Sequence, residues 1–343
     1  MAGDIFISTD LVDVDRRADL WREATKPLFD AMPYPDDEVI STEGTLIARP
    51  IGSIGLAYSK FSRKIYVRDR RTVLQSGLDN YLVQIMTGGS LTGDFNGLDV
   101  SIRPGDIVIM DLTQTFRNQA TAGSRLSFYI PRQPLEKAMN GKNLHGLILR
   151  REWPVTKLVT GYLRGLYSVG GQLSPMQADA THEAAVTLIV AALKEDALDD
   201  LAGNSVLKLA LRQRILAFID QNLNLPELSP EFIVSRFHVS RSHLYRTFAD
   251  DGGIAKVLRD KRLDAAFVEL TRKDAAALSI TEISYRFGFS SSNQLLRAFR
   301  ARFGMTPSQA REERVILRKS NEEGHLDLVT YYADLRAQIV EEG

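Results

Sequence analysis

Apolar side chains in the last third of the chain recur every three to four residues in two segments of similar layout, residues 228–248 and 279–300. This spacing predicts amphipathic helices, and each segment divides into two short helices separated by a turn. One such unit could arise by chance, whereas two with the same layout indicate a repeated element. The apolar positions expected to face inward are Leu244 and Phe248 in the first segment, and Ile280, Ile283, Phe287, Phe289, Leu295, Leu296 and Phe299 in the second.

Small polar residues and a glycine mark where these helices begin and end. Ser279 or Thr281 can cap the first helix of the second segment, and Ser290 stands where a cap of the next helix is expected. Gly288 lies between them and can adopt the left-handed conformation that residues with a Cβ resist. Ser240 occupies the matching cap position of the first segment. The pattern therefore predicts two helix-turn-helix units.

The second helix of each unit leaves a polar outer face. Its side chains can hydrogen-bond to base edges or phosphates, so we predict contact with DNA. The alternative is the ordinary polar surface of a helix, which would explain one unit more readily than two. The predicted DNA-binding residues are Ser240, Arg241, Ser242, Tyr245 and Arg246 in the first unit, and Ser291, Ser292, Asn293, Gln294 and Arg297 in the second.

Residues 212–315 resemble the DNA-binding domain of AraC/XylS-type regulators. The resemblance departs from the family pattern at Val234 and Ser284, where a small Ala is usual, and at Leu295, where an aromatic residue is common. These departures affect the fine geometry of the core rather than the fold. The matching motifs are His238-Val239-Ser240, Leu244 to Phe248, Arg262-Leu263-Asp264-Ala265-Ala266, Ile283 to Phe289, Arg297-Ala298-Phe299-Arg300 and Arg302 to Ser308.

The resemblance implies a reader of two successive major grooves, about one helical turn or ~34 Å apart. A linker helix over residues 254–270 would hold the two recognition helices on one side of the duplex. Arginine there can read guanine or hold phosphate, asparagine can read adenine, and serine carries little information. The residues implied to face bases are Ser242, Tyr245 and Arg246 from the first unit, and Ser292, Asn293 and Arg297 from the second.

Charge separates this region from the rest of a chain whose 43 basic and 43 acidic residues balance. Residues 212–318 hold 18 Lys and Arg against 12 Asp and Glu, a net charge of +6, and the remainder holds 25 against 31, a net charge of −6. A basic module beside an acidic one suits a protein that touches phosphate with one domain only, although such an imbalance also arises by chance.

The N-terminal half alternates short β-type runs with Gly, Pro and Asn turns, which predicts a β-barrel or a double-sheet jelly roll. Residues 88–111, with the turn Pro104-Gly105-Asp106, resemble the cupin-like effector domain of AraC-type regulators. The fold class is therefore α+β, with a β-rich cupin-like domain followed by an all-α domain with two helix-turn-helix units. The predicted strands are residues 44–49, 54–61, 80–86, 99–102, 106–111 and 125–129.

Helices are predicted over residues 14–29 and, after the β region, in two segments at residues 155–166 and 174–198. The first of the two has its apolar residues, Leu158 among them, at helical spacing. The pair could form a dimer interface or pack on the β domain. We expect four regions, with an effector-sensing domain at 1–150, a helical dimerisation segment at 151–204 that ends in a linker, a DNA-binding domain at 205–318 and a helical extension at 319–343.

One cluster of the β region could bind an effector. If it forms a strand, alternation places Lys64, Tyr66, Arg68 and Arg70 on one face, which suits an anion such as a carboxylate, phosphate or nucleotide. The alternative is a charged edge strand that resists aggregation. A weaker hypothesis is a cyclic di-nucleotide site, because Lys64-x-x-x-Arg68 and residues 99–105 nearly match PilZ-type motifs. The candidate effector-binding residues are Arg63, Lys64, Tyr66, Arg68, Arg70 and Arg71.

Several classes of function are disfavoured. The chain has no Cys, and none of its five His lies in the β region, so we expect no metal, no cofactor and no catalytic residue. No signal peptide or membrane span is evident, and we expect a cytoplasmic protein. The favoured interpretation is an effector-controlled regulator, most simply an activator that is a homodimer and contacts RNA polymerase. A constitutive dimeric regulator and an enzyme fused to a DNA-binding module are the alternatives.

Overall fold

The chain forms two compact units. The computed structural model describes residues 4–34, 42–51, 54–139, 142–197, 205–225, 227–249, 251–271, 278–312 and 330–331. Residues 1–200 and 317–343 make up the first unit, and residues 201–316 make up the second. The predicted interdomain linker at residues 199–204 lies outside the described residues.

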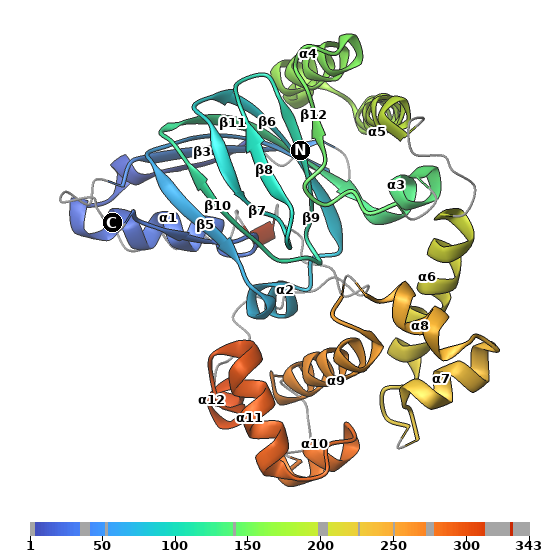
Figure 1. Ribbon diagram of the computed structural model, residues 1–343. Helices are drawn as coiled ribbons and strands as arrows, with labels where there is room; N and C mark the ends of the chain where they lie inside the picture. Colours follow the sequence, from blue (N-terminus) through green and yellow to red (C-terminus); the bar gives the residue numbers. More distant parts are fainter. Residues whose placement is uncertain are drawn as a thin grey trace. The chain divides into compact units, whose positions relative to one another are not determined.

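Two antiparallel sheets face each other in the first unit (Figure 1). The seven-stranded sheet has the order β1-β3-β4-β11-β6-β9-β12, and the five-stranded sheet has the order β2-β5-β10-β7-β8. The strands of the first sheet are β1 (Ile5–Ser8), β3 (Gly44–Ile51), β4 (Ile54–Phe61), β6 (Asn80–Gly88), β9 (Ile107–Asp111), β11 (Gly123–Pro131) and β12 (Ile148–Leu149). The strands of the second are β2 (Asp30–Met32), β5 (Lys64–Arg68), β7 (Leu91–Asp94), β8 (Asp99–Ile102) and β10 (Phe116–Ala120).

This sandwich confirms the α+β class and the double-sheet alternative, because the sheets are open rather than closed into a barrel. All six predicted strands are present, and β4 and β8 have the predicted bounds. The short β7 and β10 were not predicted. In β10 the buried Asn118 lies between the exposed Arg117 and Gln119, so hydropathy gives no alternation.

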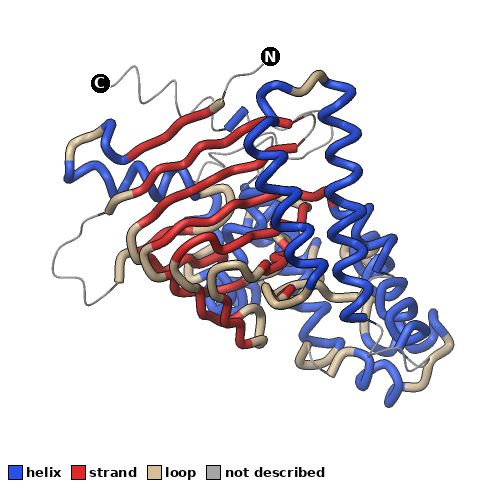
Figure 2. The backbone as a smooth tube through the Cα atoms, turned by 90° about the horizontal axis from the view of Figure 1, so that it is seen from above, coloured by secondary structure: helices blue, strands red, loops and turns tan. Residues whose placement is uncertain are grey.

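Two long helices, α4 (Pro154–Val169) and α5 (Pro175–Ala197), lie side by side across the outer face of the seven-stranded sheet (Figure 2). The ring of Phe128 on β11 lies 6.1 Å from that of His182 on α5. Val159, Leu163 and Leu166 form the buried stripe of α4 and belong to the apolar core of the first unit. Leu158, expected on that stripe, lies off it and is 64% exposed.

Shorter helices close the ends of the sandwich. The predicted helix at residues 14–29 is instead the 3-10 turn η2 (Val14–Arg16) followed by α1 (Arg17–Thr25). The others are η1 (Thr9–Leu11), α2 (Arg70–Ser76), α3 (Arg132–Met139) and η3 (Gly170–Gln172). Of the predicted C-terminal extension, only residues 330–331 are described. They are helical, and the buried Tyr331 donates its hydroxyl to the carbonyl of Glu23 on α1.

The regular elements described in the second unit are all helices. Helix α9 (Ile254–Thr271), the predicted linker, contributes Ile254 and Leu258 to a core shared with Leu244 and Phe248. Its later residue Phe267 stacks on Phe299, with ring centres 5.9 Å apart, and contacts the tilted ring of Phe303 at 4.8 Å. The remaining helices are α6 (Ser205–Gln221), α7 (Pro230–Phe237), α8 (Arg241–Thr247), α10 (Ile280–Arg286), α11 (Ser292–Phe303) and α12 (Pro307–Glu312).

Candidate DNA-binding surface and the buried polar groups of the sandwich

The first helix-turn-helix is α7 and α8. The Ser229 side chain caps α7, and the Ser240 hydroxyl caps α8 by accepting from the backbone N–H of His243 at 3.1 Å, as predicted. His238 ends α7 in the left-handed conformation, at φ 52°. A residue with a Cβ is unfavourable there, so Leu244 and the neighbouring core contacts must hold this turn.

The second helix-turn-helix is α10 and α11. Ser279 and Glu282 form a reciprocal capping box, and Gly288 adopts φ 70° in the turn, as predicted. The cap of α11 is Ser291 rather than Ser290, because Ser291 Oγ accepts from the N–H of Gln294 at 3.2 Å. Ser290 instead donates its N–H and hydroxyl to Gln294 Oε1.

The helix caps divide the predicted DNA-binding residues into two groups. Ser240, Ser291 and Gln294 use an oxygen to cap a helix, although each keeps N–H or O–H groups that could donate to a phosphate. Ser292 is half-buried at the first turn of α11. Ser240 and Gln294 are exposed, and so are the six residues without a capping role, which are Arg241, Ser242, Tyr245 and Arg246 on α8, and Asn293 and Arg297 on α11.

Two arginines of this surface carry unpaired charge. Neither Arg246 nor Arg297 forms an ion pair with any residue that the structure describes. Arg241 differs, because it lies 3.7 Å from Glu231 and its guanidinium carbon lies 5.7 Å from the centre of the Tyr245 ring. Exposed guanidinium groups without a carboxylate partner are available to phosphate or to guanine. Leu296, expected to face inward, is 40% exposed beside them.

Polar contacts attach α9 to both helix-turn-helix units. Arg262 donates to the carbonyl of Leu228, just before α7, at 2.9 Å. Arg302 on α11 donates to both carboxylate oxygens of Asp264, at 2.7 and 3.0 Å, and lies 3.0 Å from Asp260. Bidentate contacts of this kind fix geometry as well as adding energy. The helix therefore restrains the two helix-turn-helix units through its polar as well as its apolar face.

The predicted effector cluster divides between the interior and the surface. Lys64 and Tyr66 on β5 are buried, and Lys64 donates to Thr42 Oγ1 at 2.9 Å. Arg63 is exposed, with its guanidinium 3.9 Å from the centre of the Tyr34 ring. The prediction that Arg70 shares a strand face with Lys64 and Tyr66 is wrong, because the strand ends at Arg68. Arg70 and the half-buried Arg71 both begin α2.

Arg68 is fully buried and its guanidinium is saturated. It donates to the carbonyls of Leu112, Pro27 and Leu28 and to Ser76 Oγ. Burial lowers the pKa of Arg68 to about 9. With its donors engaged, Arg68 joins the end of β9 to the turn after α1. The near match to a PilZ-type motif thus has both of its cations, Lys64 and Arg68, inside the sandwich.

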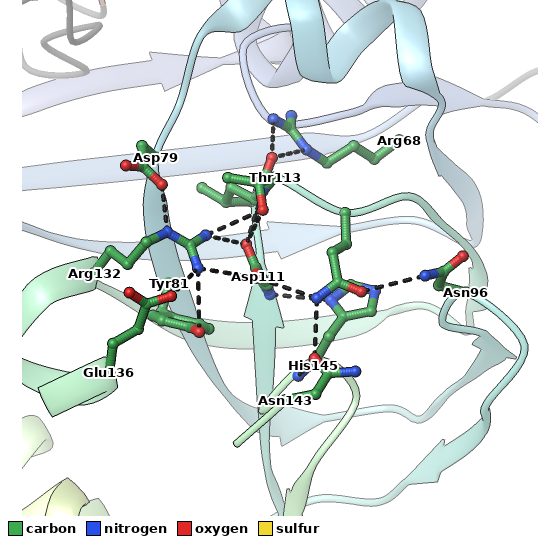
Figure 3. Close-up of polar contacts among 12 residues, drawn as sticks. Arg68, Asp79, Tyr81, Asn96, Asp111, Thr113, Arg132, Glu136, Asn143 and His145 are labelled. Carbon is green, nitrogen blue, oxygen red and sulfur yellow. Dashed lines mark hydrogen bonds and ion pairs between the residues drawn. The ribbon is translucent and has the colours of Figure 1, made fainter. Parts of the chain in front are cut away.

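Asp111, at the end of β9, centres a second polar cluster (Figure 3). Arg132 pairs with Asp111 and Asp79 and donates to Glu136 at 3.0 Å. Thr113 donates to the same carboxylate through its N–H and hydroxyl. Burial raises the pKa of Asp111, but the hydrogen bonds from Arg132 and Thr113 and the Arg132 charge outweigh it and hold that pKa below 3.8.

His145 joins the end of β9 to the turn that leads into β10, and Figure 3 shows it beside Asp111. Its Nδ1 accepts from the N–H of Asp111 at 3.0 Å, which requires a neutral ring whose Nε2–H donates to the carbonyl of Thr115 at 3.1 Å. Burial lowers the pKa of His145. Sequence reasoning missed both the His145 contacts and the Asp111 cluster, because their partners lie tens of residues away. Since these groups satisfy one another, the cluster is structural.

The described residues contain no group of three or more His, Asp or Glu that could hold a metal ion. In the same part of the chain, no helix combines the length and the apolar character needed to cross a membrane.

The fold and the paired helix-turn-helix units define a two-domain DNA-binding regulator. A model of the AraC-binding-like domain matches residues 36–194, and a model of a helix-turn-helix domain matches residues 233–313. The chain belongs to the AraC family of transcription regulators, which confirms the resemblance stated from the sequence.

Known proteins extend this match over most of the chain. Transcriptional activator NphR of Rhodococcus sp. is 24% identical over 270 residues, which is 77% of this chain and 79% of that protein. Probable transcription factor PqrA of Proteus vulgaris is 33% identical over 101 residues, which is 29% of this chain and 80% of that protein. The crystal structure of the AraC-like transcriptional activator CuxR has the same fold, with a TM-score of 0.52, 20% identity and coverage of 78% of this chain and 96% of that one.

Proposed function

We propose that this chain is a cytoplasmic transcription activator that reads two successive major grooves with α8 and α11, under control of a small molecule bound in the sandwich. The observation that carries the proposal is that Arg246 and Arg297, one on each recognition helix, are exposed and form no ion pair with the residues described. The Rhodococcus relative NphR is a transcriptional activator, which favours activation and hence contact with RNA polymerase.

The direct readers in this proposal are Ser242, Tyr245 and Arg246 on α8, and Ser292, Asn293 and Arg297 on α11. Each arginine can donate two hydrogen bonds to guanine, and Asn293 can pair with adenine. Arg241, Ser240, Ser291 and Gln294 would bind phosphate and position the helices. Because α9 contacts both units, their spacing along the duplex would be fixed at about one helical turn, or ~34 Å.

We further propose that the active form is a homodimer joined through α4 and α5. Apolar side chains on these helices point away from the sandwich core, with Leu158 64% and Met176 81% exposed. Exposed apolar residues that gather on one pair of helices favour an interface with a second copy. The same observation is compatible with a constitutive dimeric regulator whose N-terminal domain only dimerises, and a response to a small molecule would exclude that alternative.

Methylation interference on DNA from the chain's own upstream region tests the two-groove reading. We expect methylation of guanine N7, which lies in the major groove, to block binding at two short stretches whose centres are about one helical turn apart. A single interfering stretch would mean that only one unit reads bases. Interference confined to adenine N3, in the minor groove, would contradict the proposal.

A further inference from the structure

Arg125 on β11 is a buried cation without a counter-charge. The residue is 4% exposed and faces the five-stranded sheet from the opposite one. Its guanidinium carbon lies 5.1, 4.8 and 4.6 Å from the ring centres of Phe29, Phe61 and Tyr66. Nε donates to Ser59 Oγ at 3.3 Å, and among the described residues no carboxylate forms an ion pair with Arg125.

Three other arginines that are largely enclosed have oxygen acceptors that Arg125 lacks. Arg132 and Arg302 each pair with a carboxylate, and Arg68 has oxygen acceptors around its guanidinium. Aromatic rings attract a cation through their faces, but they leave the N–H groups at its edge without acceptors. A buried charge is costly unless it is paired and hydrogen-bonded. An anion at the guanidinium edge of Arg125 would offset this cost.

Polar atoms without partners share this interior. Trp21 Nε1 and the Tyr66 hydroxyl, both donors, are buried and make no hydrogen bond of normal geometry to a described residue, although Trp21 and Arg125 lie close to that hydroxyl. The same holds for two acceptors, Gln84 Oε1 and Asn118 Oδ1. Burial raises the pKa of Tyr66, against the effects of nearby Arg125 and Trp21, so its hydroxyl stays protonated and able to donate.

Strand register places these groups on facing inner surfaces. Asn118 pairs with Tyr66 between β10 and β5, so their side chains lie next to each other on the five-stranded sheet. Gln84 pairs with Ser127, two residues along β11 from Arg125, on the seven-stranded sheet. Native interiors leave few polar groups unsatisfied, and several at one place require an explanation.

We propose that Arg125 anchors a binding site for a small organic carboxylate between the two sheets. The carboxylate would accept from the guanidinium edge, the Tyr66 hydroxyl and Trp21 Nε1, and the flanking rings would contact a flat apolar body. Gln84 and Asn118 would accept from a hydroxyl or amino group of the ligand. One guanidinium matches the single charge and planar geometry of a carboxylate better than a phosphate dianion.

This site deepens the proposed function, because it names the class of molecule to which the regulator responds. Benzoate is the probe, with benzamide as its neutral counterpart, and binding to the full chain is followed by tryptophan fluorescence. The two tryptophans are Trp21 and Trp153, and Trp21 belongs to the site. We compare wild type with Arg125→Met and with Arg117→Met, which removes an exposed arginine from β10.

We expect benzoate at millimolar concentration to quench or shift the fluorescence of wild type and Arg117→Met, and benzamide to have little effect. Arg125→Met should weaken benzoate binding by about 10–100-fold, since it removes a charge-assisted bidentate contact. Without benzoate, Arg125→Met should unfold at a temperature no lower than wild type, because it removes an unpaired buried charge.

The proposal is overturned if wild type does not bind benzoate, if Arg125→Met binds it equally well, or if benzamide binds as tightly. A lower unfolding temperature of Arg125→Met without ligand would also contradict it, since the arginine would then be a structural cation held by its rings. DNA binding by each variant without benzoate is measured in parallel. If wild type does not bind specific DNA, the proposed function is contradicted. If DNA binding is intact but benzoate does not bind, only this site is contradicted.

Discussion

Arg297→Ala and Arg246→Ala are each expected to weaken binding to a specific DNA site by about 1–3 kcal/mol, a loss of roughly 5–150-fold. Each guanidinium is exposed and unpaired among the described residues, so its removal leaves the fold intact and deletes only contacts to DNA. Binding to unrelated DNA should fall much less, because it depends on phosphate contacts spread over the whole surface.

Fluorescence anisotropy with a specific and a scrambled duplex at one salt concentration measures both losses. Arg117→Ala serves as the control, because it removes an exposed arginine from β10, outside the helical unit. An equal loss on the two duplexes would reassign the altered arginine to phosphate binding. Unchanged binding to both would mean that α8 or α11 does not face DNA.

Asp111→Asn is expected to destabilise the sandwich by about 3–5 kcal/mol, the range found when one partner of a buried ion pair is removed. The Asp111 side chain is 6% exposed and that of Arg132 is 16% exposed, so the guanidinium would keep its charge with less compensation. Asp79 and Glu136 remain as partners of Arg132 in this variant. We therefore expect a loss of stability toward the lower end of that range.

Urea unfolding followed by tryptophan fluorescence isolates this effect, because Trp21 and Trp153 both belong to the first unit. Asp99→Asn, an exposed carboxylate on β8, is the matched control and should change little. A change below about 1 kcal/mol in Asp111→Asn would be typical of a surface ion pair and would contradict the structural role of the cluster.

Acid should weaken the same region in two steps. The folded pKa of His145 is lowered, so its contribution is complete above the unfolded value of 6.5 and is lost as pH falls below it. The folded pKa of Asp111 is also lowered, so its contribution is complete above 3.8 and is lost below that value as pH falls through the folded pKa.

Local sequence signals predicted the helical unit well. Caps at Ser240 and Ser279 and the left-handed Gly288 depend on residues within four positions, and these were placed correctly. The cap of α11 was assigned one residue early because two serines, Ser290 and Ser291, stand together. Only the hydrogen bond from the N–H of Gln294 distinguishes them.

The sandwich was less predictable where charged residues lie inside it. Arg68 resembled a surface cation, but its acceptors are main-chain carbonyls up to 44 residues away, and no side-chain pattern encodes them. The burial of Arg125 was not predicted, because it is a single charged residue in an apolar strand. Its burial depends on how β11 faces the opposite sheet. The sequence thus left open whether this cluster is an anion-binding face or a charged edge strand, and which side of each strand faces inward became clear only from the pairing of the sheets.

Specific DNA binding titrated against salt tests the central claim most directly. Purified protein is bound to DNA from its own upstream region and to a scrambled duplex over a range of salt concentrations. The account predicts tighter binding to the upstream DNA at every salt concentration, and a linear fall of log affinity with log salt that Arg297→Ala displaces downward. Equal affinity for both duplexes, with and without benzoate, would contradict a regulator that reads sequence with α8 and α11.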